Sequence, residues 1–222
     1  MFMNLFSVFD PVTLLFSLNW LSMILFFFLT PQLYWFNLSR LIYLIKFVNF
    51  NLLNEFKVIL FNNFNMKNLI FLMGLFFYIV FNNFMGLFPY IFTSSSHMVF
   101  SLVYSFSMWL SFNLFGFFKN LYFMLIHMVP MGTPFFLMMF MVLIELLSNI
   151  IRPLTLSIRL MANMVAGHLL MTLMSNFLST LMFMYLFMFI IQILLLILEM
   201  MVSLIQSYVF VILLILYMKE TN

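Results

Sequence analysis

Two long apolar stretches near the C-terminal end, residues 135–175 and 181–217, limit the possible folds more than any other feature of this sequence. As α-helices, stretches of about 40 residues would each be about 60 Å long, twice the roughly 30 Å hydrocarbon thickness of a bilayer. A polar turn at residues 175–180 joins them. They predict a long membrane-embedded helical hairpin that is either steeply tilted or broken, and Pro153 is the obvious place for a kink.

The composition extends this conclusion to the whole chain. Of its 222 residues, 67% are hydrophobic and only 6% are charged, whereas soluble domains carry roughly a quarter charged residues. The length allows about five or six membrane-embedded helices and leaves no room for a separate soluble domain. We therefore expect an all-α polytopic membrane protein with a single membrane domain over residues 1–222.

The other apolar segments are shorter. Residues 12–29, 68–88 and 98–118 are each long enough to cross the membrane once. Residues 37–65 mix apolar, charged and Asn residues, which predicts an amphipathic segment on the membrane surface. The connection from residue 37 to 67 holds four of the eight basic residues, so the positive-inside rule places it on the matrix side of a mitochondrial membrane, with the N-terminus opposite.

Several function classes are excluded by residue counts. The chain has no cysteine, which excludes disulfides and Cys-ligated metal centres. Its net charge of +3 comes from scattered residues, so no nucleic-acid partner is expected. No phosphate-binding Gly-Lys motif is present, and hence no ATP chemistry is expected on this chain. We predict no metal and no cofactor.

A set of ionisable residues interrupts the first long stretch. Glu145, Arg152 and Arg159 are spaced seven apart and share one helix face, which Asn149 and Asn163 extend. A charge at the bilayer centre costs about 2.5–3.5 kcal/mol or more, so such residues are functional candidates by default.

The second long stretch carries a matching stripe. Glu199, Gln206 and Glu220 also fall at multiples of seven, with Ser203 one turn from Glu199. An antiparallel hairpin would place Gln206 opposite Arg159, Glu220 opposite Glu145, and Glu199 near His168. His168 lies nine residues from Arg159, about 180° around the helix, so these two residues are expected to serve different compartments.

Three motifs in the first long stretch, IRPL (151–154), SIRLMAN (157–163) and AGHLL (166–170), resemble subunit a of the rotary F-type ATP synthases, in its mitochondrial form. LIQSYVF (204–210), NNFMGLFP (82–89) and PMGTP (130–134) extend the resemblance along nearly the whole chain, and NLFSVFDP (4–11) is similar to arthropod versions. The excess of Phe and Met is typical of an AT-rich organelle genome. The expected location is the mitochondrial inner membrane, with several crossings.

The resemblance implies that the hairpin lies against a ring of c subunits and that two offset half-channels meet at Arg159. A guanidinium cannot relay protons, but it favours the ionised form of a rotor carboxylate. His168 and Glu199 would serve the intermembrane-space half-channel, and Glu145 and Glu220 the matrix one. Bacterial relatives tend to carry an acid at the position of His168 and a histidine at that of Glu199. Further expected partners are other stator subunits, membrane lipid and protons.

Simpler interpretations exist for several of these residues. Arg152 is equally consistent with neutralising Glu145, and Glu220 with a solvated charge at the chain end. Asn163 and Gln206, which would support Arg159 together with Ser203, also suit an interhelical hydrogen bond. His97 and His127 fit ordinary solvated loop histidines.

Two other functions remain as alternatives. One is a quinone-binding or electron-transfer subunit of a respiratory complex, but the three histidines, 30 and 41 residues apart, offer no matched pair of haem ligands. The other is a secondary transporter, for which the sequence lacks an inverted repeat.

Overall fold

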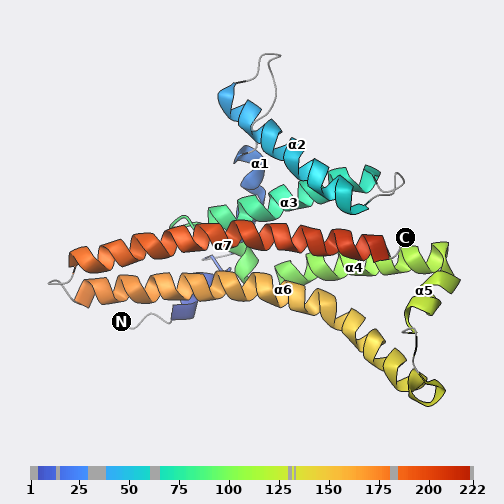
Figure 1. The fold of residues 1–222 in the computed structure, drawn as a ribbon. Helices are drawn as coiled ribbons and strands as arrows, with labels where there is room; N and C mark the ends of the chain where they lie inside the picture. Colours follow the sequence, from blue (N-terminus) through green and yellow to red (C-terminus); the bar gives the residue numbers. More distant parts are fainter. Residues whose placement is uncertain are drawn as a thin grey trace.

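The computed structural model describes residues 5–13, 16–29, 39–60, 66–129, 132, 134–180 and 185–220. Every regular element in these ranges is a helix, which confirms the predicted all-α class (Figure 1). Within the described ranges, four helices are long and apolar enough to cross a membrane. They are α3 (Met66–Gly86), α4 (Met98–Lys119), α6 (Phe135–Thr180) and α7 (Tyr185–Glu220).

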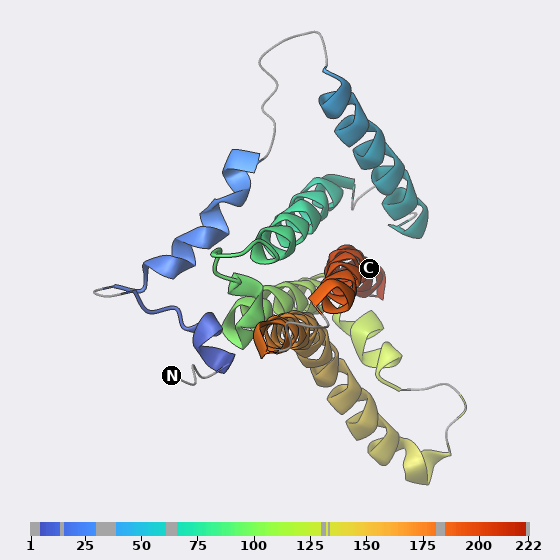
Figure 2. The same cartoon turned by 90° about the vertical axis from the view of Figure 1, so that its left-hand side faces the viewer.

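The predicted C-terminal hairpin is formed by α6 and α7, which lie side by side and antiparallel (Figures 1 and 2). The C-terminal part of α6 follows α7, whereas its N-terminal part bends away from α7 (Figure 1). Pro153 lies buried inside α6. A proline removes one helical hydrogen bond and crowds the preceding turn, which accounts for the bend. Of the two alternatives, a bend and a straight tilted helix, the structure therefore has the bend.

The hydrophobic core lies around the C-terminal half of α7. Phe210 and Ile215 of α7 are fully buried, in one cluster with Leu72 of α3 and Phe56 of α2 (Arg40–Leu60). The Tyr208 hydroxyl also donates a hydrogen bond to Glu55 of α2 at 2.9 Å. Residues 185–202 of α7 include no buried side chain. The N-terminal half of α7 thus has its apolar surface exposed in the described part of the chain.

Helix α2 falls within the segment predicted to lie on the membrane surface. It lies at an angle to the hairpin in Figure 1, and its basic residues Arg40, Lys46 and Lys57 are exposed while Phe56 and Leu60 are buried. Its location on a membrane surface remains a prediction.

The expected first span, residues 12–29, differs from a continuous α-helix. The segment contains a 3-10 helix, η2 (Leu18–Ile24), and one turn of α-helix, α1 (Phe26–Leu29). Polar side chains compete here for backbone groups, since the Asn19 amide donates to the Asp10 carbonyl at 3.3 Å and the Thr13 hydroxyl donates to the Phe16 carbonyl. Whether this segment crosses the membrane remains a prediction.

Candidate functional site

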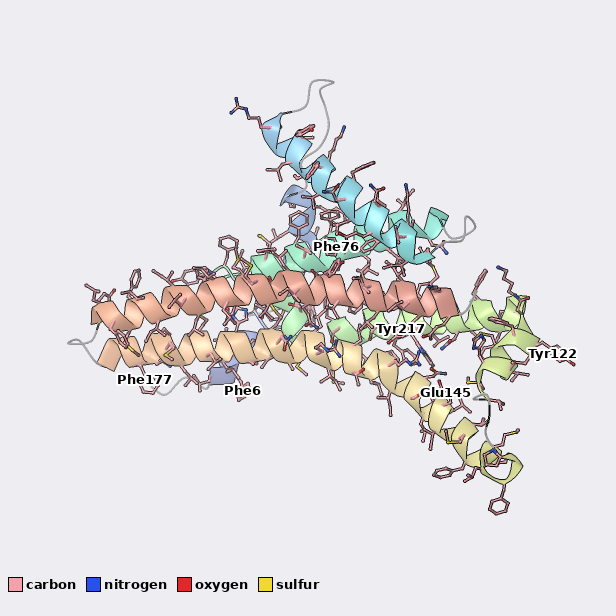
Figure 3. The ribbon with its side chains drawn as sticks, viewed as in Figure 1. Phe6, Phe76, Tyr122, Glu145, Phe177 and Tyr217 are labelled. Atoms are coloured by element: carbon pink, nitrogen blue, oxygen red, sulfur yellow. The ribbon has the colours of Figure 1, made fainter. Side chains whose placement is uncertain are left out.

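A polar cavity of about 250 Å³ lies where α6 diverges from α7. Figure 3 labels Glu145 on the diverging arm and Tyr217 near the end of α7. The cavity is also lined by α4 and by α5 (Leu121–His127). Its polar lining residues are Asn113, His127, Glu145, Asn149, Arg152, Tyr217 and Glu220. The bend in α6 therefore opens a polar space at this end of the hairpin.

Arg152 connects the two predicted acids of this cavity. Its Nη1 donates to Glu220 Oε2 at 2.6 Å, and its Nη2 lies 3.8 Å from Glu145 Oε1. The guanidinium carbon also lies 5.6 Å from the centre of the Tyr217 ring. The structure thus brings Glu145 and Glu220 to one site, but through Arg152 and not by direct opposition.

His168 and Glu199 line two further cavities, of about 200 and 360 Å³, beyond Arg159 toward the other end of the hairpin. His168 Nε2 and Glu199 Oε1 are buried, and neither has a hydrogen-bond partner in the described part of the chain. Gly167 lets the carboxylate approach α6, because a Cβ at this position would lie 2.6 Å from Glu199 Oε1. The predicted proximity of His168 and Glu199 is therefore present.

Arg159 lies between the two groups of cavities and lines none of them. It is seven residues from Arg152 and four from Asn163, which in a helix is about 10 Å and about 6 Å along the axis. Its side chain is exposed, and it forms no hydrogen bond or ion pair with the residues that the structure describes.

Near Arg159, the hairpin is joined by a hydrogen bond from Asn163 Nδ2 to Gln206 Oε1, at 2.9 Å. The interhelical bond suggested for these two amides is thus present. Gln206 thus bonds to Asn163, one turn along α6 from its expected partner Arg159. Glu199, by contrast, approaches Gly167, which is next to its expected partner His168. Ser203 is buried, and its hydroxyl donates to the Met200 carbonyl at 2.8 Å.

Of the two histidines expected to be solvated, His127 is exposed and His97 is part-buried. His127 lines the cavity of Glu145, with its ring 4.5 Å from that of Phe123. His97 is part-buried, and its Nε2 lies 2.9 Å from the Phe9 carbonyl oxygen. Neither contact follows from sequence spacing, because each depends on how a connecting segment folds back.

The family model described as ATP synthase A chain matches residues 13–219. The chain belongs to this family. It is 44% identical to ATP synthase subunit a of Apis mellifera ligustica over 99% of the chain and 97% of that relative. It is 52% identical to the Locusta migratoria subunit a and 48% to that of Anopheles gambiae, each over 147 residues. These two alignments cover 65% of the chain and 65% of each relative.

These members of the ATP synthase A chain family are insect proteins. They agree with the similarity of the opening motif, residues 4–11, to arthropod versions. The match includes α6, α7 up to Lys219, and every candidate site residue except Glu220. The roles of those residues remain predictions.

Proposed function

We propose that this chain is the proton-conducting stator subunit of the membrane sector of a rotary ATP synthase. It would form two offset half-channels that load and unload protons on a ring of c subunits. One observation carries the proposal: cavities that contain ionisable side chains lie toward opposite ends of the hairpin. Between them lies Arg159, which is exposed and has no hydrogen-bond or ion-pair partner among the described residues.

The arrangement suits a gated proton path. A proton moving down the potential gains about 2.3 kcal/mol per 100 mV, which drives rotation only if it cannot bypass the ring. A guanidinium between the cavities opposes direct passage of a positive charge and stabilises the ionised form of a rotor carboxylate that faces it. Each carboxylate would then release its proton to one half-channel and take up the next from the other.

We assign the cavity of Glu145 and Glu220 to the matrix side. Asn68 at the start of α3 contacts Met218 at the end of α7, with 3.6 Å between Nδ2 and Sδ. The basic connection before α3 therefore lies at the same end as Glu220, and the positive-inside rule favours the matrix for that connection. The cavities of His168 and Glu199 would then open toward the intermembrane space. The membrane is the mitochondrial inner membrane, and the partners are the c-ring, other stator subunits and lipid.

Isolation of the complex around the tagged chain tests this function. Mitochondrial membranes are solubilised in mild detergent, and the purified complex is returned to liposomes. We expect a c-ring and ATP-driven proton pumping. Copurification with a respiratory complex that shows haem or quinone spectra, and no c-ring, would favour the electron-transfer alternative.

The contacts of Arg152 predict compensation between charges. Arg152→Gln leaves Glu145 and Glu220 without their shared cation, so we expect ATP synthesis to fall several-fold. Glu220→Gln in the same chain should restore part of the rate, because it removes one of the two unpaired carboxylates. ATP synthesis by reconstituted complexes measures both. A double variant slower than either single variant would show that Glu220 carries protons and is not only a partner of Arg152.

The close approach of Glu199 to Gly167 limits the size of the side chain at position 167. Gly167→Ala places a methyl group against the Glu199 carboxylate, which must shift because the gap is only 2.6 Å. We expect slower proton flow in an assembled complex. Gly74→Ala is the matched control, since a Cβ at that position meets nothing within 4 Å. Equal proton flow in both variants would mean that the position of Glu199 does not limit conduction.

A further inference from the structure

The N-terminal segment lies against the cavity wall that contains His168. The short helix η1 (Leu5–Phe9) contacts α6, and Val8 lines the 360 Å³ cavity that His168 and Glu199 also line. In Figure 3 the segment labelled at Phe6 lies beside α6. A segment far from the hairpin in sequence therefore forms part of this candidate half-channel.

Phe9 makes a direct contact with the candidate proton carrier. Its ring centre lies 6.2 Å from that of His168, with the two planes at 85°. This is an edge-to-face arrangement within the distance range that aromatic pairs favour. His168 Nε2 has no hydrogen-bond partner in the described ranges, so the Phe9 ring is an important restraint on the imidazole orientation.

His97 in turn holds Phe9 through the backbone. A carbonyl oxygen only accepts, so the 2.9 Å contact requires His97 Nε2–H to donate to the Phe9 carbonyl. The His97 ring itself packs against Trp20 and Phe92, with ring centres 5.2 and 5.3 Å away. The two contacts form one chain, from His97 through Phe9 to His168.

We propose that His97 is a positioning residue for His168, acting through Phe9, and that η1 is a fixed wall of the intermembrane-space half-channel. The proposal rests on the proposed function. The hydrogen bond from His97 fixes Phe9, and the edge-to-face contact with the Phe9 ring keeps the imidazole turned toward the cavity that Glu199 shares. Without these two contacts the His168 imidazole samples other orientations, and it captures protons less often.

Among the described residues, few other ionisable groups lie near the contacts from His97 through Phe9 to His168. Glu199 of α7 and Tyr90 line the cavity with His168, and Asp10 follows Phe9 directly. None of them replaces the backbone contact, because Phe9 is held by its carbonyl oxygen. We therefore expect variants of His97 and Phe9 to change how readily His168 captures a proton, and not to act through the net charge around the cavity.

The test measures proton flux through reconstituted complexes while the pH on the His168 side is varied. His97→Leu and Phe9→Leu, which preserve bulk, should each raise the half-saturating proton concentration about 2- to 10-fold, the range of a lost aromatic contact, and change the maximal flux less. His97→Gln should restore the wild-type value because its amide can donate. The double variant should add nothing to either single variant, since both residues act through one contact chain.

Two controls distinguish a failure of the positioning role from a failure of the proposed function. Phe6→Leu, on the same short helix and 64% exposed, should have no effect. His168→Gln should impair flux, and if it does not, the proposed function of this half-channel fails. If His168→Gln impairs flux while His97→Leu and Phe9→Leu leave the half-saturating concentration unchanged, only the positioning role is wrong. Equal impairment by His97→Gln and His97→Leu would also overturn it.

Discussion

Replacement of Arg159 with alanine should reduce proton-driven ATP synthesis and ATP-driven pumping to background, although the complex should still assemble. The side chain is exposed, and its removal breaks no hydrogen bond or ion pair among the described residues. Its removal takes away the only charge between the two groups of cavities in that part of α6. Arg159→Lys should fail largely as well, because a compact ammonium lacks the planar fork that faces a carboxylate.

Coupled synthesis in liposomes and assembly on native gels are the two measurements. Arg40→Ala is the matched control, since Arg40 is an exposed arginine at the start of α2, away from the hairpin. It should retain synthesis near the wild-type rate. An Arg159→Gln complex with near-normal coupled synthesis would contradict the assigned role of Arg159.

The hairpin could be predicted because its determinants are local. Long apolar runs and two stripes of polar residues at heptad spacing are properties of each helix alone. The bond between Asn163 and Gln206 followed from these stripes because amide side chains on neighbouring helices in a bilayer form hydrogen bonds with each other. The proximity of His168 and Glu199 followed in the same way.

The observed partners of Gln206 and Glu220 and the N-terminal wall could not be predicted, because they depend on contacts between distant segments. The bend of α6 changes the partners of its diverging arm, so Glu220 meets Arg152 and not Glu145 directly. The hydrogen bond between His97 and Phe9 spans 88 residues and involves a backbone carbonyl, which leaves no trace in side-chain spacing. A histidine in a loop therefore looked solvated when it was in fact part-buried.

Exchange of His168 and Glu199 is the second large prediction. His168→Gln or Glu199→Gln alone should slow proton flow by about 10²-fold, the lower end for loss of a positioned acid-base group. His168→Glu combined with Glu199→His should recover part of this rate, because both groups line the same cavities and the exchange preserves one imidazole and one carboxyl group there.

The close packing of Glu199 against α6 limits how well the exchanged side chains can fit. Gly167 is small enough for the Glu199 carboxylate to approach within 2.6 Å of where a Cβ would lie, and a histidine at position 199 needs more room at that point. Recovery should therefore be partial and not complete. Proton flow through reconstituted complexes measures this recovery. Gln192→Leu is the comparison, since Gln192 lines the 360 Å³ cavity but carries no titratable group. If the exchanged chain conducts more slowly than both single variants in assembled complexes, His168 and Glu199 do not pass protons to each other, and each would have to reach the rotor by its own route.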